Sequence, residues 1–166
     1  MGMTDIPMPD HPHFARRTRL ALNALVPVIG ILALNAAAMV VGWGVNLPTY
    51  DRLAIAPPGW LNGLVWIAIF AAWGVARWEA RRASPEASNR SRWVNALIGA
   101  GVTYVFLAGA FGPGWSQAHN AVVLALAAMA LVRVSPVAPK ATLWLALPAA
   151  WVGYATVVSF AALTSR

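Results

Sequence analysis

The sequence predicts an all-α integral membrane protein, built as a bundle of five transmembrane helices. Of its 166 residues, 60% are hydrophobic and only 10% are charged, whereas a soluble domain has about 25% charged residues. The charges are gathered into clusters, and long uncharged stretches lie between them. A membrane-spanning helix requires about 20 apolar residues, and the uncharged stretches provide five such lengths. No alternation of apolar and polar residues indicates a β-barrel.

The uncharged stretches divide into the five expected spans. Charge is absent from residues 20–50, 53–76, 93–132 and 141–165. The third stretch is long enough for two spans, and Gly112-Pro113-Gly114 interrupts it with a strong turn signal. We therefore expect spans at about 20–43, 58–78, 93–111, 116–134 and 141–163.

The first 19 residues are polar and basic, and we expect a tail at 1–19 ahead of a single membrane domain at 20–166. The tail contains three prolines and the run Arg16-Arg17-Thr18-Arg19. A signal peptide would continue with a short apolar core and a small-residue cleavage site. Here the basic run leads directly into a full-length span, which predicts an uncleaved first helix.

Basic residues are distributed unevenly between the two sides of the predicted bundle. Ten lie before the first span, between spans two and three, or between spans four and five, and two lie on the opposite side. The positive-inside rule then places the N-terminus in the cytoplasm and the C-terminus outside, and a bacterial inner membrane is the expected location. This asymmetry accounts for most of the net charge of +7. We expect contacts with membrane lipid and no nucleic-acid partner.

Nine tryptophans are present, and several fall near predicted span ends, where aromatic residues anchor helices at the membrane interface. Trp66 and Trp73 differ, because they share one helical stripe with Phe70 at mid-membrane depth. Trp151 and Tyr154 form a similar pair in the fifth span. Such stripes are typical of helix packing and also suit the wall of a pocket for a flat apolar ligand. An inward-facing pair of Trp66 and Trp73 around a void would favour ligand binding, and an outward-facing pair would favour a subunit of a complex.

Isolated polar residues inside the spans allow two interpretations. Asn23, Asn35, Asn62, Asn95 and Asn120 are expected to join helices, at about 1 kcal/mol each. Lining a cavity for the polar edge of a ligand is the alternative.

The most specific motif precedes and opens the second span. Pro57-Pro58-Gly59-Trp60 is followed by Gly63 and Trp66. In this register the motif resembles the signature of the translocator protein family, TspO/MBR, also called tryptophan-rich sensory proteins or peripheral benzodiazepine receptors. Prolines can begin a helix without wasting an amide N–H, and Gly59 and Gly63 permit close helix approach. Gly59-x-x-x-Gly63 is compatible with a homodimer and equally with packing inside one chain.

This resemblance implies an integral membrane binding or sensory protein for apolar planar ligands. Tetrapyrroles such as porphyrin and sterol-like lipids are the implied ligand classes, and no intrinsic cofactor is expected. The expected ligand-binding residues are Tyr50, Trp60, Asn62, Trp66, Phe70, Trp151 and Tyr154. Tyr50 would belong to a lid, and Asn62 would be a polar contact.

Departures from the family pattern favour an alternative. The loop from Tyr50 to Pro57 is shorter than the family's, and Gly99, Thr103 and Phe106 stand where its third span has polar and aromatic residues. The alternative is an accessory structural subunit of a larger membrane complex, for example a bacterial photosynthetic pigment–protein complex.

No feature of the sequence indicates catalysis. The five acidic residues lie in expected tails or loops, and the chain has no cysteine. Neither a Ser-His-Asp arrangement nor a phosphate-binding glycine loop is visible. His119, near the start of the fourth span, could ligate the metal of a haem or chlorophyll, although a lone interfacial histidine is usually structural. We therefore expect neither enzyme activity nor a metal site.

Overall fold

The regular secondary structure of the chain is helical. The structure, a computed structural model, describes residues 12–43, 55–111 and 113–164, and no strand occurs in these ranges. The helices are α1 Pro12–Val40, α2 Gly59–Ala83, α3 Pro85–Arg90, α4 Arg92–Phe111, α5 Pro113–Val134 and α6 Pro139–Thr164. The predicted all-α class is confirmed.

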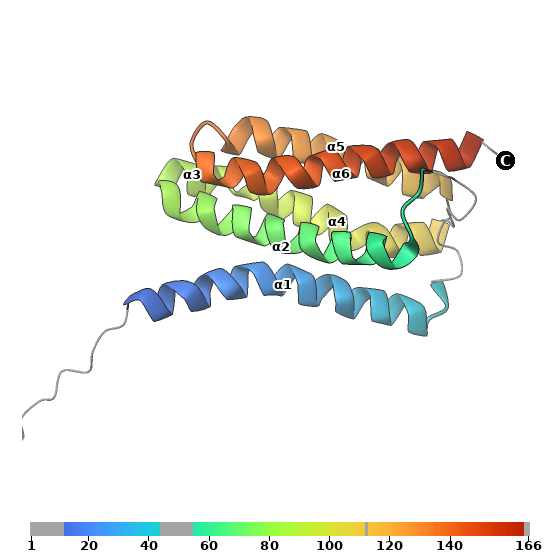
Figure 1. The fold of residues 1–166 in the computed structure, drawn as a ribbon, viewed down its shortest axis with the longest axis horizontal. Coiled ribbons are helices and arrows are strands. Elements are labelled where there is room, and N and C mark those ends of the chain that lie inside the picture. The colour runs from blue at the N-terminus through green and yellow to red at the C-terminus, as the bar shows by residue number, and fades with distance from the viewer. Residues whose placement is uncertain (1–11, 44–54, 112, 165–166) are drawn as a thin grey trace, which may run out of the picture.

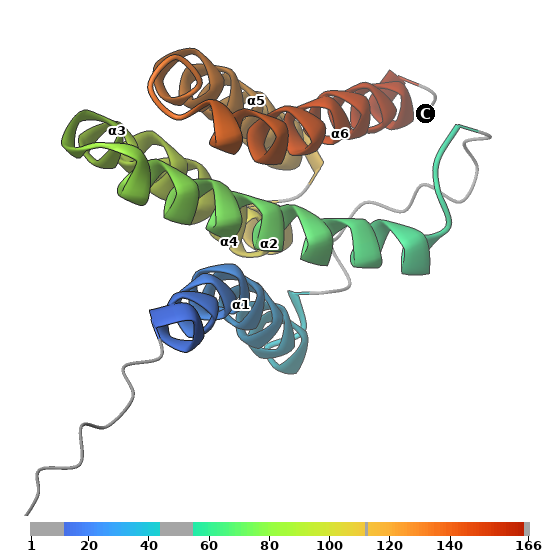
Figure 2. The ribbon, with the colours of Figure 1, turned by 60° about the vertical axis from the view of Figure 1, so that its left-hand side comes forward.

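The five long helices run along the longest axis of the molecule in three tiers (Figure 1). α1 lies on one side, α2 and α4 form the middle tier, and α5 and α6 lie on the other side, an order that Figure 2 shows from a second direction. The contacts agree, because α1 packs against both α2 and α4, while α6 packs against α2 and α5. The middle tier therefore meets both outer tiers.

Four helical segments are long and apolar enough to cross a membrane. They are Arg16–Val40, Gly59–Ala83, Gly114–Val134 and Pro139–Ala162. These segments correspond to the first, second, fourth and fifth predicted spans, and they identify an integral membrane protein surrounded by lipid. α4 supplies the remaining helix, with 20 residues, and its crossing of the membrane stays a prediction.

α1 begins earlier than the first predicted span. It includes residues 12–19, which were expected to belong to the tail. Apolarity marks the part of a helix that lies in lipid, whereas backbone hydrogen bonding can continue into water, and a proline at the first helical position is well tolerated. After Val40 the chain turns at Gly42, whose φ of 78° is accessible to glycine without strain.

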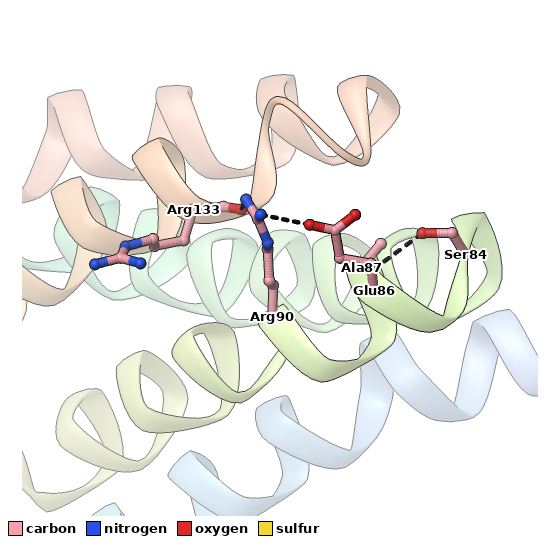
Figure 3. A network of polar contacts seen from close by, with 5 residues as sticks. All are labelled: Ser84, Glu86, Ala87, Arg90 and Arg133. Atoms are coloured by element: carbon pink, nitrogen blue, oxygen red, sulfur yellow. Dashed lines mark hydrogen bonds and ion pairs between the residues drawn. The ribbon is translucent and has the colours of Figure 1, made fainter.

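A short helix that the sequence analysis did not predict, α3, follows α2. The Ser84 hydroxyl oxygen accepts a hydrogen bond from the amide of Ala87 at 3.0 Å, which is an N-terminal cap. Glu86 lies in the first turn, where a carboxylate is favoured, and it pairs with Arg90. Arg90 also donates from Nη1 to the carbonyl of Arg133 at 3.0 Å (Figure 3). These contacts join α3 to the end of α5.

Polar contacts hold α1 against α2. The Asn23 side chain donates from Nδ2 to the carbonyl of Arg19 at 2.8 Å and accepts at Oδ1 from Arg77 Nε at 3.2 Å. Arg77 also reaches the Asn23 carbonyl oxygen, at 3.5 Å. The interpretation of Asn23 as a residue that joins helices is therefore confirmed.

Aromatic side chains fill the space between α2 and α4. Phe70 and Trp73 are 1% and 0% exposed, and their rings meet edge to face with centroids 5.2 Å apart. They pack on Gly101 of α4, where an added β-carbon would lie 2.8 Å from Trp73 Cζ3. At Gly59 and Gly63 an added β-carbon would meet nothing within 4 Å. The expected close helix approach at these two glycines is wrong within this chain, because this part of α2 faces open space.

Candidate functional site

A cavity of about 270 Å³ lies among α1, α2, α4 and α5. Most of its lining is apolar and includes Ile31 of α1 and Val123 of α5. Among the residues that the structure describes, no charged side chain belongs to the lining. Ligand pockets in proteins usually have volumes of about 300–1,000 Å³, so this cavity is slightly smaller than that range.

Aromatic rings from two helices form one part of the lining. Trp66 of α2 and Tyr104 of α4 lie nearly parallel, with an interplanar angle of 18° and centroids 6.4 Å apart. Phe70 lies beside Trp66 with a centroid separation of 6.4 Å and is held in place by Trp73 behind it. Trp73 is fully buried and Trp66 lines the cavity. Trp66 therefore borders the void, as expected for ligand binding, whereas Trp73 packs against Phe70 and does not line the cavity.

Three amide side chains supply the polar part of the lining. Asn35 comes from α1, Asn62 from α2 and Asn120 from α5. Asn120 is 4% exposed and donates from Nδ2 to the hydroxyl of Ser159 on α6 at 3.3 Å. An amide offers both a donor and an acceptor without a net charge. The polar part of the lining can therefore donate and accept hydrogen bonds without contributing a net charge.

His119 contributes to helix packing beside the cavity. Its side chain is buried, and Nε2 donates to the carbonyl of Ala100 on α4 at 2.7 Å. Its ring also lies 5.8 Å from that of Tyr104. This geometry supports the structural interpretation of His119. Across the described ranges, no group of three or more His, Cys, Asp or Glu residues could hold a metal ion.

The structure brings three of the seven expected site residues together. Asn62, Trp66 and Phe70 all line the cavity. Tyr50 lies outside the described residues. The remaining three lie elsewhere in the structure.

Trp60, Trp151 and Tyr154 do not line this cavity. Trp60 is 70% exposed. Trp151 lines a second, apolar cavity of about 320 Å³ between α2 and α6. The Tyr154 hydroxyl donates to the carbonyl of Ile55, ahead of α2. Trp66 and Trp151 are separated because they belong to different faces of the bundle. Trp66 projects from α2 toward α4, whereas Trp151 of α6 lies against the face of α2 that meets α6.

Among the lining residues that sequence reasoning did not assign to the site are Asn35, Tyr104 and Asn120. Asn35 and Asn120 were expected chiefly to join helices, and Tyr104 was not considered. A signal for Tyr104 exists, because Gly101 precedes it by about one helical turn, so a position without a side chain and an aromatic ring share one face of α4.

Comparison with known proteins gives one match. A family model described as TspO/MBR family matches residues 23–164. No curated protein and no solved structure matches the chain. The matched range includes every residue named above as lining the cavity.

Proposed function

Because this chain belongs to the TspO/MBR family, we propose that it is a membrane ligand-binding or sensory protein whose ligand occupies the cavity among α1, α2, α4 and α5. The family assignment confirms the resemblance drawn from the motif at 57–66. The observation that carries the proposal is the pair of nearly parallel rings, Trp66 and Tyr104, bordering a cavity without charged residues. Planar apolar molecules gain dispersion and ring contacts in such a setting.

The proposed ligand class is apolar and planar, and tetrapyrroles and sterol-like lipids are the candidates that the resemblance implies. The uncharged lining favours a ligand that keeps its ionised groups outside the cavity, because burying an unpaired charge is costly. A porphyrin would therefore direct its carboxylates away from Asn62 and Asn120. The volume of about 270 Å³ favours smaller ring systems, and a complete macrocycle requires the cavity to widen.

Binding is favoured over the role of accessory subunit in a larger membrane complex. The observation that favours it is the position of Trp66 at the cavity, with Trp73 buried rather than exposed on the outer surface. The proposed function requires no catalytic step and no resident cofactor. A homodimer through Gly59 and Gly63 stays a prediction.

The test is a titration of the purified protein with metal-free protoporphyrin, followed by quenching of tryptophan fluorescence. In Trp66→Leu, we expect affinity to fall about tenfold, because an aromatic contact of about 1.4 kcal/mol is lost. The matched control is Trp115→Leu, since Trp115 is 58% exposed and does not line the cavity. Its affinity is expected to be that of the unaltered protein.

Two outcomes would contradict the proposal. One is the absence of saturable binding of porphyrin and also of a smaller uncharged planar compound. The other is equal affinity in Trp66→Leu and the unaltered protein. Gentle solubilisation followed by size exclusion tests the alternative, because co-elution with other subunits or pigment would favour the accessory role.

A further inference from the structure

Charge is concentrated at one end of the helix bundle. The side chains that the structure describes include ten basic and two acidic residues. All lie toward the end where α1 begins, α2 ends and α3 is located (Figure 1). Glu86 is paired with Arg90, which leaves Glu79 as the other acidic residue there. This end therefore carries a large excess of positive charge.

Two of the arginines converge on one indole ring. The guanidinium carbon of Arg82, on α2, lies 4.4 Å from the ring centroid of Trp78. That of Arg16, on α1, lies 5.8 Å from the same ring. Each contact is worth about 0.5–1 kcal/mol at an exposed site. Trp78 therefore contacts cations from two different helices.

The arrangement lacks a negative partner. Within the described part of the chain, the Glu86–Arg90 pair is the one ion pair present, and neither Arg16 nor Arg82 takes part in it. Both arginines are exposed, so their guanidinium groups are accessible from outside. Two like charges that contact one ring repel each other, and an anion that binds both guanidinium groups would offset this repulsion.

The location of this cluster indicates the source of the anion. Arg16 is the first residue of a segment apolar enough to cross a membrane, and Arg82 lies in the last turn of another. Tryptophan also favours the membrane interface. Farther along α1, Leu22 and Val26 are more than half exposed and provide apolar contacts for acyl chains.

We propose that Arg16, Trp78 and Arg82 form a binding site for the phosphate group of an anionic phospholipid. Guanidinium groups bind phosphate through paired hydrogen bonds, and anionic lipids accumulate beside basic clusters at the membrane surface. The indole contacts both arginines in the absence of lipid. This proposal is independent of the ligand cavity, since none of the three residues lines it.

The experiment measures retention of phosphatidylglycerol and of phosphatidylcholine by the full-length protein in detergent, using native mass spectrometry. The unaltered protein is expected to retain phosphatidylglycerol preferentially. Replacing Arg16 and Arg82 with Gln is expected to weaken this binding roughly fivefold for each arginine. Trp78→Leu keeps both charges and loses the ring that both arginines contact, so an intermediate loss is expected. It also serves as the second test if the double variant does not fold.

The matched control replaces Arg133 and Lys140 with Gln. Both residues are exposed at the same end of the bundle, so the net charge changes by the same amount. We expect little loss of phosphatidylglycerol from this variant. Equal loss from both double variants would overturn the proposal in favour of diffuse attraction, and so would equal retention of the two lipids by the unaltered protein.

A further titration distinguishes lipid from free phosphate. Inorganic phosphate is added to the unaltered protein while retention of phosphatidylglycerol is followed. The proposal expects the lipid to remain bound, since its chains contribute apolar contacts. Displacement of the lipid by phosphate at low millimolar concentration would assign the site to the free anion and overturn the lipid assignment.

Discussion

Gly74 of α2 lies directly against the backbone of Asn23 of α1. A β-carbon on Gly74 would fall 2.1 Å from the Asn23 carbonyl oxygen and 2.9 Å from the α-carbon of Ala24. Arg77, one turn farther along α2, binds both the side chain and the carbonyl of Asn23. The outer tier formed by α1 is thus joined to α2 of the middle tier by a glycine that permits close approach and by a long polar side chain one turn away.

Gly74→Ala is expected to destabilise the protein by about 1–3 kcal/mol, the usual cost of overpacking. The atoms that the new methyl group meets belong to the backbone and cannot rotate away, so α1 has to shift. Thermal unfolding of the purified protein in detergent measures the effect. Gly63→Ala on the same helix is the control, because its methyl group would enter open space and a helical alanine is favoured over glycine. Equal stability of the two variants would contradict this account.

Gly101→Ala is expected to destabilise the protein less than Gly74→Ala does, and it is also expected to alter the cavity. Its methyl group would meet the ring edges of Trp73 at 2.8 Å and Phe70 at 3.0 Å. Rings can shift, and Phe70 already borders the cavity. The same unfolding assay, together with the porphyrin titration, should show a modest loss of stability and weaker binding. Unchanged porphyrin affinity would contradict this prediction, because it would mean that the displaced rings do not alter the cavity.

The contact between Asn23 and Arg77 should be measurable as an energetic coupling. We expect a double-mutant cycle with Asn23→Ala and Arg77→Ala to give about 0.6–1.7 kcal/mol, the range for polar contacts between membrane helices. Asn95 is exposed on α4, and Asn95→Ala should combine additively with Arg77→Ala. A coupling near zero between Asn23 and Arg77 would show that their hydrogen bonds make no net contribution to the free energy of unfolding.

Site-directed labelling can decide the number and direction of the spans. The chain has no cysteine, so single cysteines at Asn89, Gly114 and Thr164 can be labelled without background, and all three positions are exposed. We expect a membrane-impermeant reagent to reach Asn89→Cys from the cytoplasmic side and the other two from the opposite side. Labelling of Gly114→Cys and Asn89→Cys from the same side would mean that α4 does not cross.

The positions of the long helices follow closely from the sequence, because the cost of charge in lipid limits where spans can lie. Helix ends outside lipid obey other rules, so the early start of α1 did not follow from apolarity. α3 was missed although Ser84-Pro85-Glu86 combines a capping hydroxyl, an initial proline and a first-turn acid. Short helices of this kind depend on local capping, to which a search for spans is insensitive.

The site was harder to derive than the fold. Helical periodicity correctly placed Trp66 and Phe70 on one side of α2. Periodicity could not identify α4 as the helix that faces these two residues, so Tyr104 was missed. For the same reason Trp151 was assigned to the site of Trp66, although it lines the second cavity between α2 and α6. Which faces meet depends on tertiary packing, as at Gly101, where a bare backbone accepts two rings.

α1 forms one wall of the cavity through Ile31, Leu32 and Asn35, while much of its remaining surface faces outward. In a bilayer, that outward surface meets lipid, so the cavity is separated from the acyl chains by a single helix. A ligand that dissolves in the bilayer would then reach the cavity by partition rather than from water. Its occupancy would depend on the ratio of ligand to lipid, and adding empty vesicles at constant total ligand would reduce the bound fraction.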